Sequence, residues 1–238
     1  MQHEEYPRIS IIIPTYNCVS TLETCLTSVR EQDYSNLELI CIDGGSADGT
    51  IELLKKHGAN IDYWVSEPDN GIYDAMNKGI DVAGGEWLYF LGADDCLFNA
   101  KVLKKVFDTP DIKKLDVIYG NVQLKHSELV YDGKFTSQKL MHKNICHQAV
   151  FVRKSYLLSA GKFFTKYHQL ADWVFNMIWF TDKKVRRKYV NIIIALFNEQ
   201  GRSSANVDGC FYRDKDTIIR KHFSIIDRLR YAFEYIVF

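Results

Sequence analysis

The segment ISIIIPTYN at residues 9–17 begins with a run of β-branched residues and ends in proline and small polar residues. Apolar runs of this kind recur along the first part of the chain, and their starts lie 28, 24 and 26 positions apart (9 to 37, 37 to 61 and 61 to 87). Short apolar runs separated by enough chain for a helix are typical of parallel strands buried on both faces. The strands predicted in this way are Ile9–Ile13, Leu37–Ile42, Ile61–Val65 and Trp87–Leu91.

Helical signals fill the spaces between these strands. Ser20-Thr21-Leu22-Glu23 is a capping-box pattern, in which the hydroxyl and the carboxylate would each satisfy a free backbone N–H group. Further helices are predicted at Thr50–His57 and Ile72–Val82, and each is followed by glycine, which commonly ends a helix. The second half is less regular: the pattern predicts strands at 117–119 and within 122–134, a turn at Asp132-Gly133, a strand at 149–152 and a helix at 171–180.

The composition argues against several classes of protein. Thirty basic residues balance thirty acidic ones, whereas a nucleic-acid-binding protein usually carries net positive charge. No apolar run reaches the ~20 residues that span a bilayer, and Met1–Arg8 is too polar for a signal peptide. The six cysteines form no CxxC pair, so we expect reduced thiols and a cytoplasmic protein.

Acidic and small polar residues follow the predicted strands. Because the carboxyl ends of parallel strands meet at one edge of the sheet, where ligands bind, these residues are expected to share a rim. The segments are Pro14–Asn17, Asp43–Gly49, Ser66–Gly71 and Gly92–Asp95.

The pair Asp94-Asp95 is the centre of this rim. Adjacent carboxylates repel, and each raises the pKa of the other unless a cation offsets the charge. A hard divalent ion such as Mn²⁺ or Mg²⁺ takes oxygen ligands and bridges phosphates, so it suits this pair. The alternative is that the pair only caps the next helix. The acids on neighbouring loops favour the metal site.

Four segments also appear in the order and spacing of a known family's motifs. They are ISIIIPTYN at 9–17, IDGGSADGT at 42–50, SEPDNGIYDAMNKG at 66–79 and LGADD at 91–95. These segments resemble the successive motifs of family 2 glycosyltransferases, and HQA at 147–149 and ADW at 171–173 extend the resemblance to about residue 180. The resemblance implies an α/β, A-type glycosyltransferase fold with a Rossmann-like, mostly parallel central sheet flanked by helices.

The resemblance implies a donor site for a nucleoside-diphosphate sugar. Asp95 would be the direct ligand of Mn²⁺ or Mg²⁺, and Asp94 would contact ribose or sugar. Ala93 stands where the family's Asp-x-Asp motif has its first acid. Pro14, Thr15 and Tyr16 would line the pocket of the base, which is commonly uracil, and Asp43 would form a hydrogen bond to that base. The other residues implied for the donor site are Asp69, His147 and Arg202.

Asp172 matches the family's catalytic base. Inverting transfer needs a carboxylate to take the proton of the acceptor hydroxyl as its oxygen attacks the anomeric carbon. The alternative is that Asp172 is a helix N-cap. Arg202 lies in the segment 198–204, which resembles the flexible loop that closes over the donor in this family. The alternative is that this segment is a solvated turn. No Gln-x-x-Arg-Trp signature is present, so the resemblance implies one sugar per binding event.

The last segment has apolar residues at helical spacing, with basic residues between them. A basic amphipathic helix over 217–238 would lie on the inner face of the cytoplasmic membrane near a lipid-linked or oligosaccharide acceptor, pack on the domain, or form a homodimer contact. Its apolar positions are Ile219, Phe223, Ile226, Leu229, Phe233 and Ile236. We divide the chain into a catalytic domain over 1–210, with a nucleotide-sugar half (1–100) and an acceptor half (101–210), and a C-terminal helical tail over 211–238.

Taken together, these features predict an inverting, metal-dependent glycosyltransferase that uses a UDP-sugar and acts in cell-surface polysaccharide biosynthesis. A sugar-nucleotide pyrophosphorylase would need a Gly-rich, basic phosphate loop after the first strand, where Pro14–Asn17 stand instead. A Rossmann dehydrogenase would need G-x-G-x-x-G at the same place. A non-catalytic nucleotide-sugar-binding protein stays an alternative, although the presence of Asp172 with the other acids argues against it.

Overall fold

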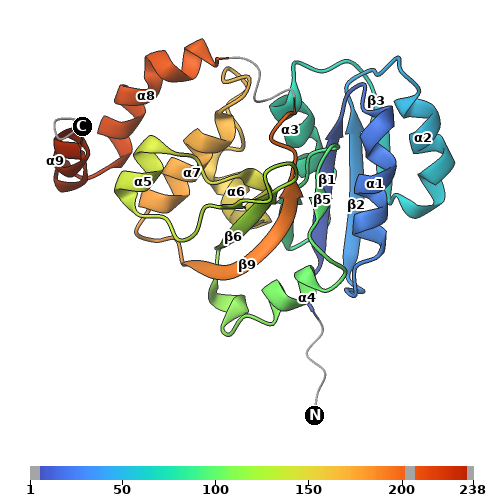
Figure 1. Cartoon of the computed structure of the whole chain (residues 1–238), viewed down its shortest axis with the longest axis horizontal. Coiled ribbons are helices and arrows are strands. Elements are labelled where there is room, and N and C mark those ends of the chain that lie inside the picture. Colours follow the sequence, from blue (N-terminus) through green and yellow to red (C-terminus); the bar gives the residue numbers. More distant parts are fainter. Residues whose placement is uncertain (1–5, 202–206, 235–238) are drawn as a thin grey trace.

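The computed structural model describes residues 6–201 and 207–234 (Figure 1). Both halves of the chain contribute to one curved sheet, with the strand order β3-β2-β1-β4-β8-β6-β9-β5 and with β7 paired to β6. The parallel arrangement of β1 to β4 confirms the expected α/β fold. The sheet as a whole is mixed rather than mostly parallel, because the second half adds antiparallel pairs.

The first half follows the sequence pattern closely. Its strands differ from the predicted ranges by one or two residues, and its second and third helices match. The strands are β1 (Ile9–Thr15), β2 (Leu37–Asp43), β3 (Tyr63–Ser66) and β4 (Trp87–Phe90). The helices are α1 (Val19–Arg30), α2 (Thr50–His57) with the short η1 (Gly58–Asn60), and α3 (Ile72–Val82).

The second half joins the sheet mainly through antiparallel pairs. β8 (Val150–Arg153) lies between β4 and β6 (Val117–Leu124) and is antiparallel to both. The long β9 (Arg187–Phe197) runs parallel to β6, and its end pairs with β5 (Cys96–Leu97). The predicted turn at Asp132-Gly133 is wrong. The chain turns at 125–129 instead, where the Leu124 N–H group donates to the Leu129 carbonyl before β7 (Val130–Tyr131).

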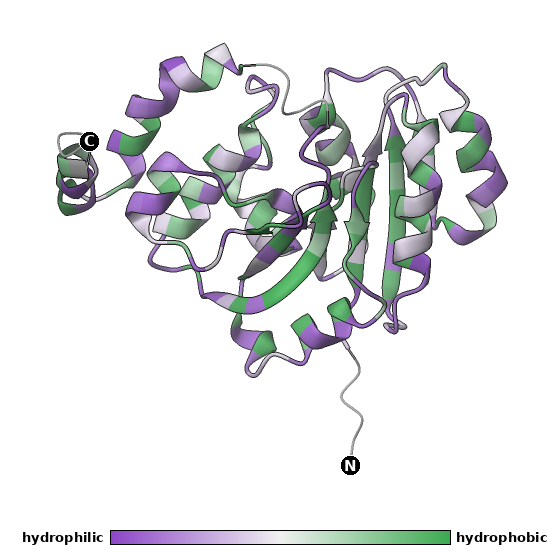
Figure 2. Ribbon diagram, viewed as in Figure 1, coloured by the Kyte–Doolittle hydropathy of each residue, from purple (hydrophilic) through white to green (hydrophobic). Residues whose placement is uncertain are grey.

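Helices cover both faces of the sheet. Along β1 the side chain of Ile12 faces one hydrophobic cluster, which includes residues of α3 and α7, whereas Ile11 and Ile13 face a second cluster, which includes residues of α1 and α4. The strands in the middle of the molecule are correspondingly hydrophobic in Figure 2. The remaining helices are α4 (Val102–Phe107), η2 (Ile112–Lys114), α5 (Ser137–His142), η3 (His147–Ala149), α6 (Lys154–Ala160) and α7 (Ala171–Thr181).

The predicted capping box does not form. Helix α1 begins at Val19, and no side chain of its own N-cap residue, Cys18, bonds to the helix. The free N–H group of Val19 donates instead to Asp48 Oδ2 (3.1 Å), in the loop after β2. Glu23 pairs with His57 Nε2 (2.8 Å) on α2. The sequence pattern missed this cap because its acceptor comes from a distant loop.

The C-terminal segment forms two helices rather than one. Helix α8 (Gly209–His222) and helix α9 (Ile225–Glu234) are separated by Phe223, whose backbone is extended. Ile219 and Phe223 are buried in the core, whereas Ile226, Leu229 and Phe233 are exposed, and Ile236 lies outside the described residues. The expected continuous stripe is therefore wrong. No helix in the described ranges is long and apolar enough to cross a membrane.

Candidate active site

The predicted rim forms at the carboxyl ends of β1, β2 and β4. Thr15, the last residue of β1, pairs in register with Asp43, the last residue of β2. Pro14 and Thr15 are buried there, and the side chain of Tyr16 projects beyond them and is 54% exposed. The three residues expected around a nucleotide base thus stand at the edge where ligands bind in such sheets.

Asp43 is completely buried and surrounded by hydrogen-bond donors. Its Oδ1 accepts from Ser46 Oγ (2.5 Å) and Thr15 Oγ1 (3.2 Å). Its Oδ2 accepts from Ser66 Oγ (2.6 Å) and from the N–H groups of Gly45 (3.0 Å) and Ser46 (2.9 Å). A carboxylate offers about four lone-pair sites, so these donors saturate it. Asp43 therefore ties together the ends of β1, β2 and β3, and a base could bond to it only by displacing one of them.

The same donors set the pKa of Asp43. Burial raises the pKa, but the hydrogen bonds from Ser46, Ser66 and Thr15 outweigh burial and hold the pKa below its ordinary value. Asp43 is therefore ionised at neutral pH.

Asp69 lies next to the loop that follows β2. A Cβ atom placed on Gly44 would come within 2.6 Å of Asp69 Oδ2, so the two loops touch only because residue 44 is glycine. Asp69 Oδ1 also accepts from the N–H group of Gly71 (2.8 Å), directly before α3. The predicted donor residue Asp69 is thus held on the rim beside Asp43.

Asp95 is buried at the end of β4 and is 1% exposed. Its Oδ1 accepts from the N–H group of Asn198 (2.7 Å), and its Oδ2 accepts from Gln148 Nε2 (2.6 Å). Gly92 makes room for it, because a Cβ atom there would lie 2.4 Å from Asp95 Oδ2. Burial raises the pKa of Asp95 to about 6, and the neighbouring charge of Asp94 adds to the effect.

Asn198 binds both carboxylates of the pair. Besides its N–H bond to Asp95, its Nδ2 donates to Asp94 Oδ2 (2.9 Å). Gly201 also lies against Asp94, since a Cβ atom there would be 2.6 Å from Asp94 Oδ2. Residues 198–201 of the loop after β9 therefore lie over the acidic pair. Arg202, the residue of that loop expected to contact the donor, lies outside the described residues.

Asp172 lies in the first turn of α7 and is almost fully buried. It is not the N-cap residue, which is Leu170. Asp172 Oδ1 accepts from Tyr73 Oη (2.8 Å) and from the N–H group of Trp173 (2.8 Å), and its Oδ2 accepts from Asn144 Nδ2 (2.8 Å). These contacts fix the orientation of the carboxylate, which a proton acceptor requires.

The short helix η3 joins the two acidic centres. Gln148 holds Asp95, and the adjacent His147 places its Nδ1 3.5 Å from Asp172 Oδ2. The Nε2 atom of His147 is buried and has no hydrogen-bond partner within the described residues.

The residues around Asp95 fit a divalent cation. A cation would offset the repulsion between the carboxylates of Asp94 and Asp95. Within residues 6–201 and 207–234, no group of three or more His, Cys, Asp and Glu side chains could hold a metal unaided. A metal at this site therefore needs ligands from elsewhere, which the oxygens of a diphosphate can supply.

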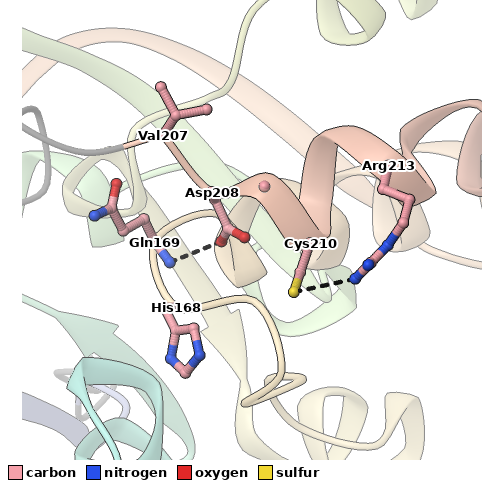
Figure 3. A pocket seen from close by; sticks show the side chains of 7 residues that line it. His168, Gln169, Val207, Asp208, Cys210 and Arg213 are labelled. Atoms are coloured by element: carbon pink, nitrogen blue, oxygen red, sulfur yellow. Dashed lines mark hydrogen bonds between the residues drawn. The ribbon is translucent and has the colours of Figure 1, made fainter.

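A cavity of about 560 Å³ opens near Asp172, between the loop before α7 and the start of α8. Figure 3 shows His168, Gln169 and Arg213 around it. Asp208 bonds to the N–H group of Gln169 (2.9 Å) and so fixes α8 against that loop. Tyr73 Oη lies 2.8 Å from both Asp172 Oδ1 and the Gln169 carbonyl, which links the cavity wall to the buried acid.

Sequence reasoning missed three contacts of the site. Tyr73, Asn144 and Asn198 were not expected to contact the acids, because each reaches its acid only through the tertiary fold. Gln148 lies in the HQA segment that the resemblance singled out, so that segment was a usable signal.

Comparisons with known proteins agree with this geometry. The model of "Glycosyl transferase family 2" matches residues 10–189. A "PGL/p-HBAD biosynthesis glycosyltransferase" of Mycobacterium bovis (strain BCG / Pasteur 1173P2) is 37% identical over 206 residues, which cover 84% of this chain and 80% of that protein.

Two solved structures share the fold. Staphylococcus aureus TarS 1–349 in complex with UDP-GlcNAc has a TM-score of 0.71 at 18% identity, over 91% of this chain and 68% of that one. The mannosyltransferase PcManGT from Pyrobaculum calidifontis, in complex with GDP-Man and Mn²⁺, has a TM-score of 0.62 at 18% identity, over 83% of this chain and 58% of that one. With its family match, its curated relatives and its A-type fold, the chain belongs to glycosyl transferase family 2 and is a glycosyltransferase.

Proposed function

We propose that the protein moves a sugar from a nucleoside-diphosphate sugar to an acceptor hydroxyl, with inversion at the anomeric carbon and with Mn²⁺ or Mg²⁺ at Asp95. The observation that carries the proposal is the short helix η3, which places a contact to Asp95 and a contact to Asp172 on adjacent residues. The leaving diphosphate and the incoming hydroxyl need one acidic centre each. The adjacent residues His147 and Gln148 would hold the two centres in a fixed position relative to each other.

On the donor side, Asp95 would hold the metal and Asp94 would contact the sugar or ribose, and His147 would lie near the diphosphate. The bound metal would neutralise the charge that grows on the departing nucleoside diphosphate. Pro14, Thr15 and Tyr16 would form the base pocket. Asp43 and Asp69 would position the loops around it.

On the acceptor side, Asp172 would take the proton of the attacking hydroxyl. The acceptor oxygen forms a bond to the anomeric carbon while the bond from that carbon to the phosphate oxygen breaks. The nucleoside diphosphate leaves with the bonding electrons, and the proton moves to Asp172. A single displacement of this kind inverts the anomeric centre. The hydrogen bonds from Tyr73 and Asn144 would hold the carboxylate of Asp172 in one orientation toward the acceptor hydroxyl during the reaction.

The donor is proposed to be a UDP-sugar, and the acceptor a lipid-linked glycan in the synthesis of a cell-surface polysaccharide. Structures of the same fold hold UDP-GlcNAc in one case and GDP-Man in another, so both nucleotides belong in the test. The curated relative is named for the biosynthesis of PGL/p-HBAD. The six cysteines are unpaired, which supports a cytoplasmic location.

A thermal-shift screen of UDP- and GDP-sugars with and without Mn²⁺ tests this proposal. A ligand that binds the folded state raises the melting temperature by mass action. We expect a UDP-sugar to raise the melting temperature only when Mn²⁺ is present. No rise with any nucleotide sugar would contradict the proposed donor site.

A further inference from the structure

Helix α9 is packed with its polar side inward. Asp227 accepts from Gln138 Nε2 (3.2 Å), and the ring of Tyr231 lies 4.4 Å from that of His142, so both contact α5. The opposite side carries large apolar side chains that are more than half exposed. They are Ile225 (66%), Ile226 (63%), Leu229 (55%) and Phe233 (65%).

These side chains form one continuous stripe. Ile225, Leu229 and Phe233 follow one another at intervals of four residues, and Ile226 lies beside them on the same face. Helix α9 stands at the outer end of the molecule, far from β1 and β2 (Figure 1). A contiguous apolar surface of this kind usually marks an interaction site rather than chance exposure.

The size of the stripe argues against a second copy of the chain as its partner. Four large side chains that are each more than half exposed present roughly 100 Å² of accessible surface apiece, so the stripe covers on the order of 400 Å². A stable dimer buries about 800 Å² on each partner. Helix α9 alone is therefore too small for a stable dimer contact. A lipid surface needs no such area, because the apolar side chains enter it individually.

The charge around the stripe favours an anionic surface. Residues 217–234 contain four basic residues and two acidic ones, in a chain whose thirty basic and thirty acidic residues balance. Arg220, Lys221 and Arg230 are exposed. One of the two acids, Asp227, is already engaged by Ser224 and Gln138. Arg230 lies on α9 itself, and Arg220 and Lys221 lie in the last turn of the preceding helix, α8. Apolar and basic residues combined in one segment are typical of helices that lie in the interface of an anionic membrane.

We propose that α9 docks the enzyme on an anionic lipid bilayer, with Ile225, Ile226, Leu229 and Phe233 in the interface and Arg220, Lys221 and Arg230 at its headgroups. The buried α8 then serves as the rigid connection, because Phe211, Ile218 and Ile219 fix it in the core. This placement deepens the proposed function, because it would hold the active site next to a lipid-linked acceptor. Docking itself requires neither donor nor metal.

Flotation of the full-length protein with vesicles tests the proposal. One set of vesicles contains phosphatidylcholine alone, and the other contains equal parts of phosphatidylcholine and phosphatidylglycerol. We expect the protein to float with the anionic vesicles at low salt and to be released from them by high salt. Leu229→Ser combined with Phe233→Ser should abolish flotation, and Arg220→Glu combined with Arg230→Glu should weaken it. Wild-type protein that does not float with the anionic vesicles would overturn the proposal.

The matched control replaces two exposed leucines elsewhere. Leu129 (65% exposed) and Leu158 (44% exposed) lie outside α9 and the active site, and the double serine variant should float like the wild type. Equal flotation of the α9 variant and the wild type would refute docking through the stripe. A dimer that the α9 variant converts to monomer, without vesicle binding by the wild type, would assign the stripe to self-association and also refute it.

A second variant tests insertion without removing the apolar surface of α9. Phe233→Trp keeps the stripe apolar, and its fluorescence should shift to shorter wavelength when anionic vesicles are added. No shift would contradict insertion. UDP binding with Mn²⁺, measured without vesicles, should be unchanged in every α9 variant. Failure of docking is thereby distinguished from failure of the proposed donor site.

Discussion

Asp43 and Asp95 are two buried carboxylates at the same edge of the same sheet, and their surroundings are opposite. Asp43 accepts five hydrogen bonds, and these hold its pKa below the ordinary value. Asp95 accepts two, lies beside Asp94, and has its pKa raised to about 6. Burial alone therefore does not decide the direction in which the pKa of an acid shifts. The hydrogen-bond donors and the charges around the acid decide it.

The two acids therefore have different proposed roles. The charge of Asp43 is fully compensated by hydrogen bonds from its own loops, so we expect Asp43 to stabilise the loops around the proposed base pocket. The two hydrogen bonds to Asp95 do not compensate its negative charge beside Asp94, and a bound cation would compensate it.

Asp95→Asn should lower turnover by about a thousand-fold, because stabilisation of the leaving group by a metal contributes several kcal/mol. The fold should survive. The amide oxygen can accept from the Asn198 N–H group, and Gln148 can turn its own amide to accept from the new NH₂ group. Transfer assays and thermal melts check both points. Near-normal turnover would mean that the metal is not held at Asp95.

Asp172→Asn should lower turnover by roughly a hundred- to ten-thousand-fold, the range typical of a lost general base. Donor binding should be retained, because the proposed role of Asp172 is on the acceptor side. Kinetics with saturating donor, together with donor binding by calorimetry, separate the two effects. Loss of donor binding would move Asp172 out of the role of base.

Asp43→Asn should lower the free energy of unfolding by about 3 kcal/mol, the scale of lost hydrogen bonds to a buried charge. An amide oxygen in the position of Oδ2 can still accept from Gly45, Ser46 and Ser66, but the NH₂ group then replaces the oxygen that accepts from the Ser46 and Thr15 hydroxyls. The charge that strengthens all of these bonds is lost as well. Urea denaturation measures this loss, with Asp95→Asn as the control that should lose little. Equal losses in the two variants would break the contrast.

The two acids should also have opposite effects on stability as the pH changes. The pKa of Asp43 is lower in the folded state, so its contribution is full above about pH 4 and is lost as the pH falls further. The pKa of Asp95 rises from 3.8 to about 6 on folding, so its ionisation removes about 3 kcal/mol of stability as the pH rises through that window. Asp95→Asn should abolish the second effect, and Asp43→Asn should leave it intact, as pH-dependent denaturation can show.

The sequence predicts the first half of the fold well, because each strand from β1 to β4 is a local apolar run and enough chain for a helix separates each strand from the next. The antiparallel placement of β8 depends on partners more than sixty residues away (Leu88 with Val152), which no local pattern encodes. The same limit of local sequence patterns applies to the active site. Asp95 and Asp172 are found from their motifs, whereas Asn198 and Tyr73 reach them only through the fold.

Calorimetric titration of UDP and GDP into the wild type and Asp95→Asn, with Mn²⁺ or with EDTA, tests the central assignment most directly. The assignment predicts that one nucleotide binds the wild type when Mn²⁺ is present, and that EDTA or Asp95→Asn abolishes this binding. Binding of equal affinity in EDTA or in Asp95→Asn would contradict it, as would no binding of either nucleotide.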